Sequence, residues 1–205
     1  MFRGFFSADN PFFVPFGKLV DVVCLSLLWV VCSLPIVTVG PATAALYDST
    51  ARCLRGGQGG PYARFLRTFR ESLQAGVPAG LLAAAAAWGI YRLHRFLYLR
   101  ALGRGLWYAG YFFFWVVALV VIGALGYLLP ALSRFDLSLG RLLGNCWKLS
   151  MIHLPSTAAL GVLLTAAFIF FYDLPFLAIF FLPCLTALAA SLLLERIFKP
   201  FMGEE

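Results

Sequence analysis

Long uncharged stretches separated by short clusters of arginine dominate the sequence. A helix needs about 20 mostly apolar residues to cross the hydrocarbon core of a bilayer. Five stretches are long enough, and they predict spans at about residues 20–39, 72–92, 106–130, 152–172 and 174–195. Only Asp173 and Pro175 mark the break between the last two, so these two spans should form a tight helical hairpin. The pattern therefore predicts an all-α fold, a polytopic transmembrane helical bundle that makes one membrane domain of residues 1–205.

Three of the connecting segments have the periodicity of amphipathic helices, and we expect them at the membrane interface. They cover about residues 42–55, 61–74 and 138–148. In the second segment, the apolar face consists of Tyr62, Phe65, Leu66, Phe69 and Leu73. Arg64 and Arg67 fall on the opposite face, and Arg70 lies near the boundary. This helix is expected to run directly into the second span.

A helix break is predicted between the first span and the first interfacial helix. Pro35 removes a backbone donor, so it should kink or end the span. Gly40 and Pro41 follow and should redirect the chain toward the membrane surface. Broken helices of this kind bind substrates in transporters, which makes the segment a candidate site if the protein transports a solute.

The composition supports a membrane protein and argues against a nucleic-acid partner. The chain is 62% hydrophobic and 12% charged, whereas soluble domains are about 25% charged. Its net charge of +7 comes from arginines that lie between the apolar runs, as membrane topology requires. With five spans, one side would carry Arg52, Arg55, Arg64, Arg67, Arg70, Arg134, Arg141, Lys148, Arg196 and Lys199. The other side would carry Arg3, Lys18, Arg92, Arg95, Arg100 and Arg104. The positive-inside rule then places the N-terminus outside and the C-terminus inside.

Signals for catalysis, cofactors or metals are missing from the sequence. The five cysteines form no CxxC pair, and His94 and His153 lack a metal-binding spacing. The glycine run at 56–60 lacks the Lys-Ser/Thr of a phosphate-binding loop and is interpreted as a flexible hinge. No ionisable residue lies near the middle of a span, which argues against a proton-coupled carrier. We therefore expect no catalytic residue, no cofactor and no metal.

One stretch of the chain is distinctive. It contains Ser33-Leu34-Pro35 and Thr38, followed by Gly40-Pro41-Ala42-Thr43-Ala44-Ala45-Leu46-Tyr47. Together with Asn10-Pro11 and the helix around Phe65 to Phe69, this stretch resembles the YesL-like family of bacterial integral membrane proteins. The resemblance is strong over about residues 5–75. The family has no known biochemical function, and the resemblance implies a companion of carbohydrate-uptake systems, especially ATP-driven sugar importers.

Three classes of function remain open from the sequence. The first is a non-enzymatic accessory protein of the bacterial plasma membrane, whose partners are the lipid bilayer and the permease subunits of a sugar importer. Its candidate interaction residues are Arg64, Phe65, Arg67, Phe69 and Arg70, which suit either a partner protein or anionic lipid. The second is a small-solute or lipid transporter. The third, an intramembrane enzyme, lacks any visible set of catalytic residues. The oligomeric state is left open.

Overall fold

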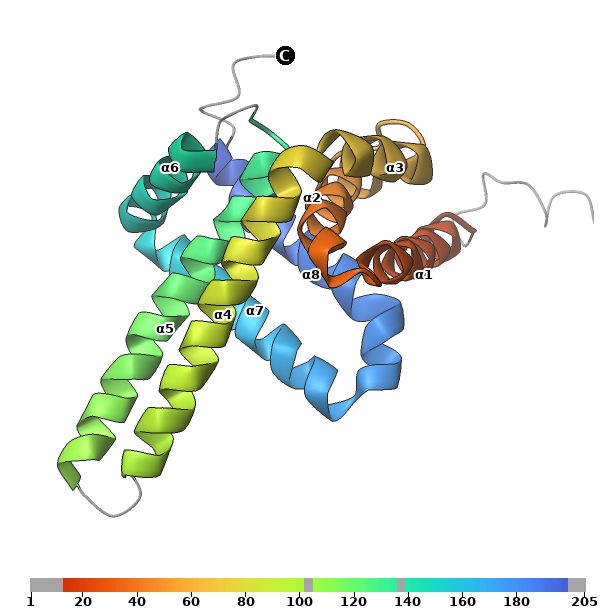
Figure 1. Cartoon of the computed structure of the whole chain (residues 1–205). Coiled ribbons are helices and arrows are strands. Elements are labelled where there is room, and N and C mark those ends of the chain that lie inside the picture. Colours follow the sequence, from red (N-terminus) through yellow and green to blue (C-terminus); the bar gives the residue numbers. More distant parts are fainter. Residues whose placement is uncertain (1–12, 102–104, 136–138, 199–205) are drawn as a thin grey trace, which may run out of the picture.

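The protein is built of helices. A computed structural model describes residues 13–101, 105–135 and 139–198, which contain no strand. Its helices are α1 (Phe13–Ser33), α2 (Val39–Ser49), α3 (Pro61–Glu71), α4 (Leu73–Ala101), α5 (Gly105–Leu132), α6 (Leu139–Ile152), α7 (Leu154–Asp173) and α8 (Pro175–Phe198) (Figure 1). A short 3₁₀ turn, η1 (Ile36–Thr38), precedes α2, and a π-helix, η2 (Thr50–Arg55), continues it. The predicted all-α fold is confirmed.

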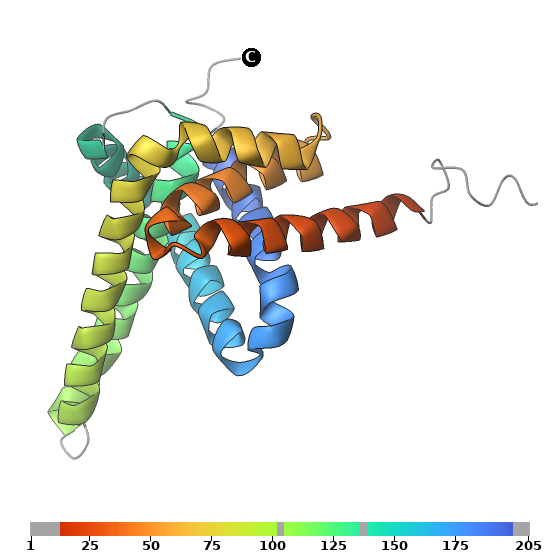
Figure 2. The same cartoon turned by 45° about the vertical axis from the view of Figure 1, so that its right-hand side comes forward.

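Four of these helices are long and apolar enough to cross a membrane, namely α4, α5, α7 and α8. They occupy the second to the fifth of the expected spans. α4 and α5 run side by side as an antiparallel pair, and α7 and α8 form a second pair (Figures 1 and 2). Only Leu174 separates α7 from α8, as the expected tight hairpin requires. Large apolar side chains such as Phe112 and Phe168 project outward from the pairs, which suits a surface in contact with lipid.

The first expected span, residues 20–39, is not among the four candidate spans in the described part of the chain. α1 ends at Ser33, because Pro35 takes an extended conformation with ψ of 111°. The hydroxyl of Thr38 donates to the carbonyl oxygens of Cys32 and Pro35, at 2.6 and 2.7 Å, and so caps the broken end. Beyond the break the chain turns back into α2, and α1 lies across the direction of α4 (Figure 2). The described residues therefore hold four candidate spans, and a fifth crossing by α1 stays a prediction.

α2 lies at the centre of the molecule, which corrects the expectation of an interfacial helix over residues 42–55. It contacts α1, α3, α4, α5 and α8, and nearly all its residues are buried. Small side chains permit this position. A Cβ atom on Gly40 would stand only 2.2 Å from the carbonyl oxygen of Gly76 and 2.8 Å from the Cα of Gly80, both in α4. The backbones of α2 and α4 are thus in direct contact, as at close helix crossings in membranes.

The two other expected interfacial helices are present as α3 and α6, near one end of the bundle (Figure 1). α3 does not continue straight into the second span. The chain bends at Ser72, so that α3 lies across the end of α4 (Figure 2). The bend keeps helical hydrogen bonds, from the Ser72 amide to Thr68 and from the Gly76 amide to Ser72. A similar bend at His153 joins α6 to α7, so a short helix followed by a span occurs twice.

Two apolar clusters hold the helices together. The larger one joins α5, α6, α7 and α8 around Tyr127, Leu160 and Phe198. The smaller one joins α1, α2, α3 and α8 around Leu25, Phe65 and Cys184. Both clusters pack against α2, and they fix the end of the bundle where its charged residues gather.

Candidate binding site at the charged end of the bundle

A buried carboxylate, Asp48 in the last turn of α2, is the centre of a charged network. Only 2% of its side chain is exposed. Its oxygens accept hydrogen bonds from the Nε of Arg64 at 2.7 Å and the Nη1 of Arg134 at 3.2 Å. The Nε of Arg52 forms an ion pair with Asp48 at 3.2 Å. The hydroxyl of Thr68 also donates to Asp48, at 3.0 Å. A charge is stable in such a buried place only when paired and hydrogen-bonded in this way.

The helical register of α2 and η2 positions the first of these arginines. Asp48 and Arg52 are four residues apart, so they lie on the same helix face. At Thr50 the α-helix widens into the π-helix η2, a form that often occurs at functional sites. Arg55 at the end of η2 points to a different neighbour, and its Nη1 donates to the backbone oxygen of Ser191 in α8, at 2.9 Å.

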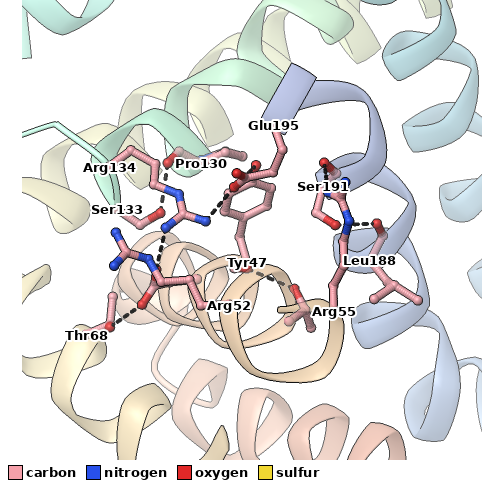
Figure 3. A network of polar contacts seen from close by, with 12 residues as sticks. Tyr47, Arg52, Arg55, Thr68, Pro130, Ser133, Arg134, Leu188, Ser191 and Glu195 are labelled. Carbon is pink, nitrogen blue, oxygen red and sulfur yellow. Dashed lines mark hydrogen bonds and ion pairs between the residues drawn. The ribbon is translucent and has the colours of Figure 1, made fainter. Parts of the chain in front are cut away.

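Arg134, just beyond the end of α5, joins three helices. Its side chain is 3% exposed and bridges Asp48 in α2 and Glu195 in α8. Figure 3 shows its guanidinium between these elements, with the ring of Tyr47 beside it. The guanidinium carbon lies 5.8 Å from the centroid of this ring. The Tyr47 hydroxyl donates to Glu195 at 3.5 Å. The Nε of Arg134 is buried and has no hydrogen-bond partner among the described residues.

The environment keeps the nearby acidic side chains of Tyr47 and Cys53 neutral. Burial raises the pKa of the Tyr47 phenol above its usual range, and the negative charge of Glu195 adds to this effect. Burial also raises the pKa of the Cys53 thiol, at the other side of the π-helix. Neither group is ionised near neutral pH, so neither is activated as a nucleophile or base.

A polar cavity of about 440 Å³ adjoins this network. Its charged lining residues are Asp48, Arg52, Arg64, Glu71 and Arg134, and they are joined by Thr68, Ser72 and Ser133. A second cavity of about 390 Å³ lies between α2, α4, α5, α7 and α8 and is almost entirely apolar. The two cavities thus differ in chemistry, one suited to a charged or hydrogen-bonding group and the other to hydrocarbon.

The structure divides the candidate interaction residues of α3 between the interior and the surface. Arg64 pairs with Asp48. Phe65 is fully buried, and its ring stacks on that of Phe69 at 6.3 Å within the smaller apolar cluster. Arg67 is exposed and pairs with Glu71 at 2.9 Å, and Arg70 is exposed as well. Of these five residues, only Arg67 and Arg70 are classed as exposed at the surface.

The candidate helix break does not form a binding site with either of these cavities. Pro35 ends α1 and is exposed, as the sequence predicts for a helix terminator. Gly40 and Pro41 lie in the first turn of α2, where they pack against Gly76 and Gly80. None of the three lines the polar or the apolar cavity.

Sequence reasoning missed the network because its members are far apart in the chain. From the sequence, Arg134 is only one of the cations expected on one side of the membrane, and Glu195 only marks the end of the last expected span. The sequence contains one signal that could have revealed this network. Residues of opposite charge lie at the ends of different predicted spans, and these ends are expected on the same side of the membrane. Of the other candidates, His94 contacts the Tyr111 hydroxyl at 3.3 Å, and the described residues contain no group of three or more metal-ligating side chains.

Four apolar spans around a central buried helix define an all-helical multi-pass membrane protein. Residues 22–92 match the profile of a family described as "Protein of unknown function, DUF624". The match covers about a third of the chain, including Asp48, Arg52 and Arg64 but neither Arg134 nor Glu195. No curated protein and no solved structure matches the chain.

Proposed function

We propose that this chain belongs to the YesL-like family and is a non-enzymatic accessory protein of an ATP-driven sugar importer in the bacterial plasma membrane. The matched segment overlaps the region on which that resemblance rests. The partners in this proposal are the surrounding lipid and the permease subunits of the importer.

The distribution of cations supports an orientation in this membrane. Most of the described cations lie near the end of the bundle formed by α3, α6 and the last turn of α8. These cations are Arg52, Arg55, Arg64, Arg67, Arg70, Arg134, Arg141, Lys148 and Arg196. Arg92, Arg95 and Arg100 lie toward the opposite end of α4; Arg3, Arg104 and Lys199 lie outside the described residues. By the positive-inside rule the richer end faces the cytoplasm. We infer four crossings, which place both the segment before α4 and the end of α8 in the cytoplasm. The five crossings expected from the sequence would instead place the N-terminus outside.

The outward face of α3 is the observation that carries the accessory role. α3 uses Arg64 and Phe65 to attach itself to the rest of the chain. It leaves Arg67, Arg70 and Leu66 exposed, the last of them with 44% of its surface accessible. A fixed helix with an unused basic and apolar face on the cytoplasmic side is suited to dock another protein.

The apolar cavity supports a second candidate, a transporter of lipids or small apolar solutes. Trp29 and Tyr47 line it together with residues of α4, α5, α7 and α8, so it lies between the two helix pairs. Against this candidate, no charged residue that could couple transport to an ion lies in the central part of these four helices. The broken segment from Pro35 to Pro41 also does not line this cavity.

Growth and uptake assays together distinguish the two functions. A deletion strain should grow poorly on one sugar, whereas liposomes containing the purified protein should take up none of a panel of labelled sugars. The double variant Arg67→Gln/Arg70→Gln should reproduce the growth defect with normal amounts of protein in the membrane. The matched control, Arg92→Gln/Arg95→Gln at the other end of α4, should grow normally. Saturable uptake by the liposomes alone would refute the accessory role and favour the transporter, and normal growth of the deletion strain on every sugar would also contradict it.

A further inference from the structure

We propose that the polar cavity beside Asp48 is a binding site for a phosphate group. This site is independent of the docking face on α3, because it is formed by different side chains. The cavity adjoins the buried network, and two of its lining arginines, Arg52 and Arg64, each keep 32% of their side chains exposed. A ligand can therefore reach them from outside.

The charges around the cavity do not balance. The cavity is lined by Arg52, Arg64 and Arg134 and by the carboxylates Asp48 and Glu71. Arg67 and Glu195 do not line it, but they form ion pairs with the lining residues Glu71 and Arg134. Arg67 and Glu71 neutralise each other at the outer edge, which leaves three guanidinium groups for the two remaining carboxylates. One positive charge is thus uncompensated, and an anion in the cavity would balance it.

The hydrogen-bonding groups also favour an oxyanion. Asp48 accepts hydrogen bonds from Arg64, Arg134 and Thr68 and also forms an ion pair with Arg52, so several donors share one carboxylate. Arg134 lines the cavity, and its buried Nε has no acceptor among the described residues. Guanidinium groups are the preferred protein partners of phosphate because their N–H groups match the spacing of its oxygens.

The position of the cavity suggests two sources for the phosphate. It lies between the start of α4, at Ser72 and Ala75, and the end of α5, at Leu132 to Phe135. These are the points where two spans leave the hydrocarbon, at the depth of lipid headgroups. A volume of about 440 Å³ exceeds that of phosphate alone and leaves room for a small esterified group. The phosphate is therefore carried by a phospholipid headgroup or by a soluble phosphate ester.

The test uses the full chain in dodecyl maltoside micelles, which contain no phosphate, with the melting temperature as the measured quantity. In one arm glycerol 3-phosphate is added to a phosphate-free buffer, with sodium chloride at equal ionic strength as the control. In the other arm phosphatidylglycerol is added to the micelles. A concentration-dependent rise of the melting temperature is expected in at least one arm, because a ligand that binds only the folded state stabilises it. The arm that responds identifies the source of the phosphate.

Two variants show whether the response comes from this cavity. Arg52→Gln removes one donor and leaves Asp48 paired with Arg64 and Arg134, and Ala75→Leu fills space without touching any ion pair. Each should weaken the apparent affinity by about tenfold or more, whereas Arg92→Gln/Arg95→Gln should respond like the wild type. No rise in either arm would overturn the proposal. An unchanged response of the folded Ala75→Leu variant would overturn it too.

Discussion

At the scale of single residues, the structure depends most on Asp48. One carboxylate holds arginines from η2, α3 and the end of α5, which are otherwise separate parts of the chain. Burying so many charges does not by itself add much stability. Removing one partner is costly, however, because the others remain buried without compensation.

Asp48→Asn should therefore destabilise the protein strongly. The amide keeps the shape of the side chain but leaves Arg64 and Arg134 without their shared counter-charge, at a cost of about 3–5 kcal/mol. The measurement is thermal unfolding in detergent. Glu71→Gln is the matched control and should change little, because its pair with Arg67 is exposed to solvent. A wild-type melting temperature for Asp48→Asn would show that the network does not stabilise the fold.

The buried thiols at this end should react slowly. Burial raises the pKa of the Cys146 thiol in α6 to about 11 and also raises that of Cys53. At pH 8 the reactive thiolate is therefore scarce, and both sulfurs are shielded. Peptide mass spectrometry after a short maleimide pulse should find both unmodified in the native protein and modified in SDS. An introduced cysteine at the exposed position of Arg67 should be labelled in both conditions, and equally fast native labelling of Cys146 would contradict its burial.

At the scale of elements, the sequence predicted the helices that can be identified by the length of an uncharged run. It missed the direction in which the chain continues between helices. α4, α5, α7 and α8 could be predicted because each contains an uncharged run long enough to cross a membrane. The same criterion does not say that the chain turns back after Pro35, and the expected span over residues 20–39 continues past that break. The periodicity of residues 42–55 predicts an interfacial helix, whereas α2 is buried. A partner of Asp48, Arg134, lies 86 residues away, and helical periodicity contains no information about it.

The crossing of α2 and α4 should tolerate no side chain at Gly40. Gly40→Ala would place a methyl group 2.2 Å from the Gly76 carbonyl oxygen, so backbones must move apart, at a cost of about 1–3 kcal/mol. Gly89→Ala, on the open side of α4, meets no atom within 4 Å and should be neutral or slightly stabilising. Melting temperatures of the two variants in the same detergent test this contrast. Equal values would mean that α2 and α4 do not cross this closely.

At the scale of the whole molecule, the spans form two pairs that meet at one charged end. α3 precedes one pair and α6 precedes the other, and both lie near that end. α4 and α7 run away from that end, and α5 and α8 return toward it. The side of the membrane on which each loop lies therefore tests this topology.

Reporter fusions should give a four-span pattern. A fluorescent reporter after the last residue should fluoresce in the cytoplasm, and so should one before the first residue, because the number of crossings is even. Alkaline phosphatase inserted at residues 102–104 should be active outside. Phosphatase activity at the N-terminus combined with fluorescence at the C-terminus would restore the fifth crossing and contradict the path of α1 across the bundle.

The bridge from Asp48 through Arg134 to Glu195 also has a consequence for biosynthesis. Ribosomes deliver the three residues in that order, and Glu195 arrives only with the last helix. A nascent chain that has inserted α5 therefore holds Arg134 with one of its two carboxylates still unmade. Until α8 joins its neighbours, this guanidinium has only Asp48 as a counter-charge, which distinguishes an unfinished molecule from a finished one. Fragments released before that point keep this uncompensated positive charge at the charged end of the bundle.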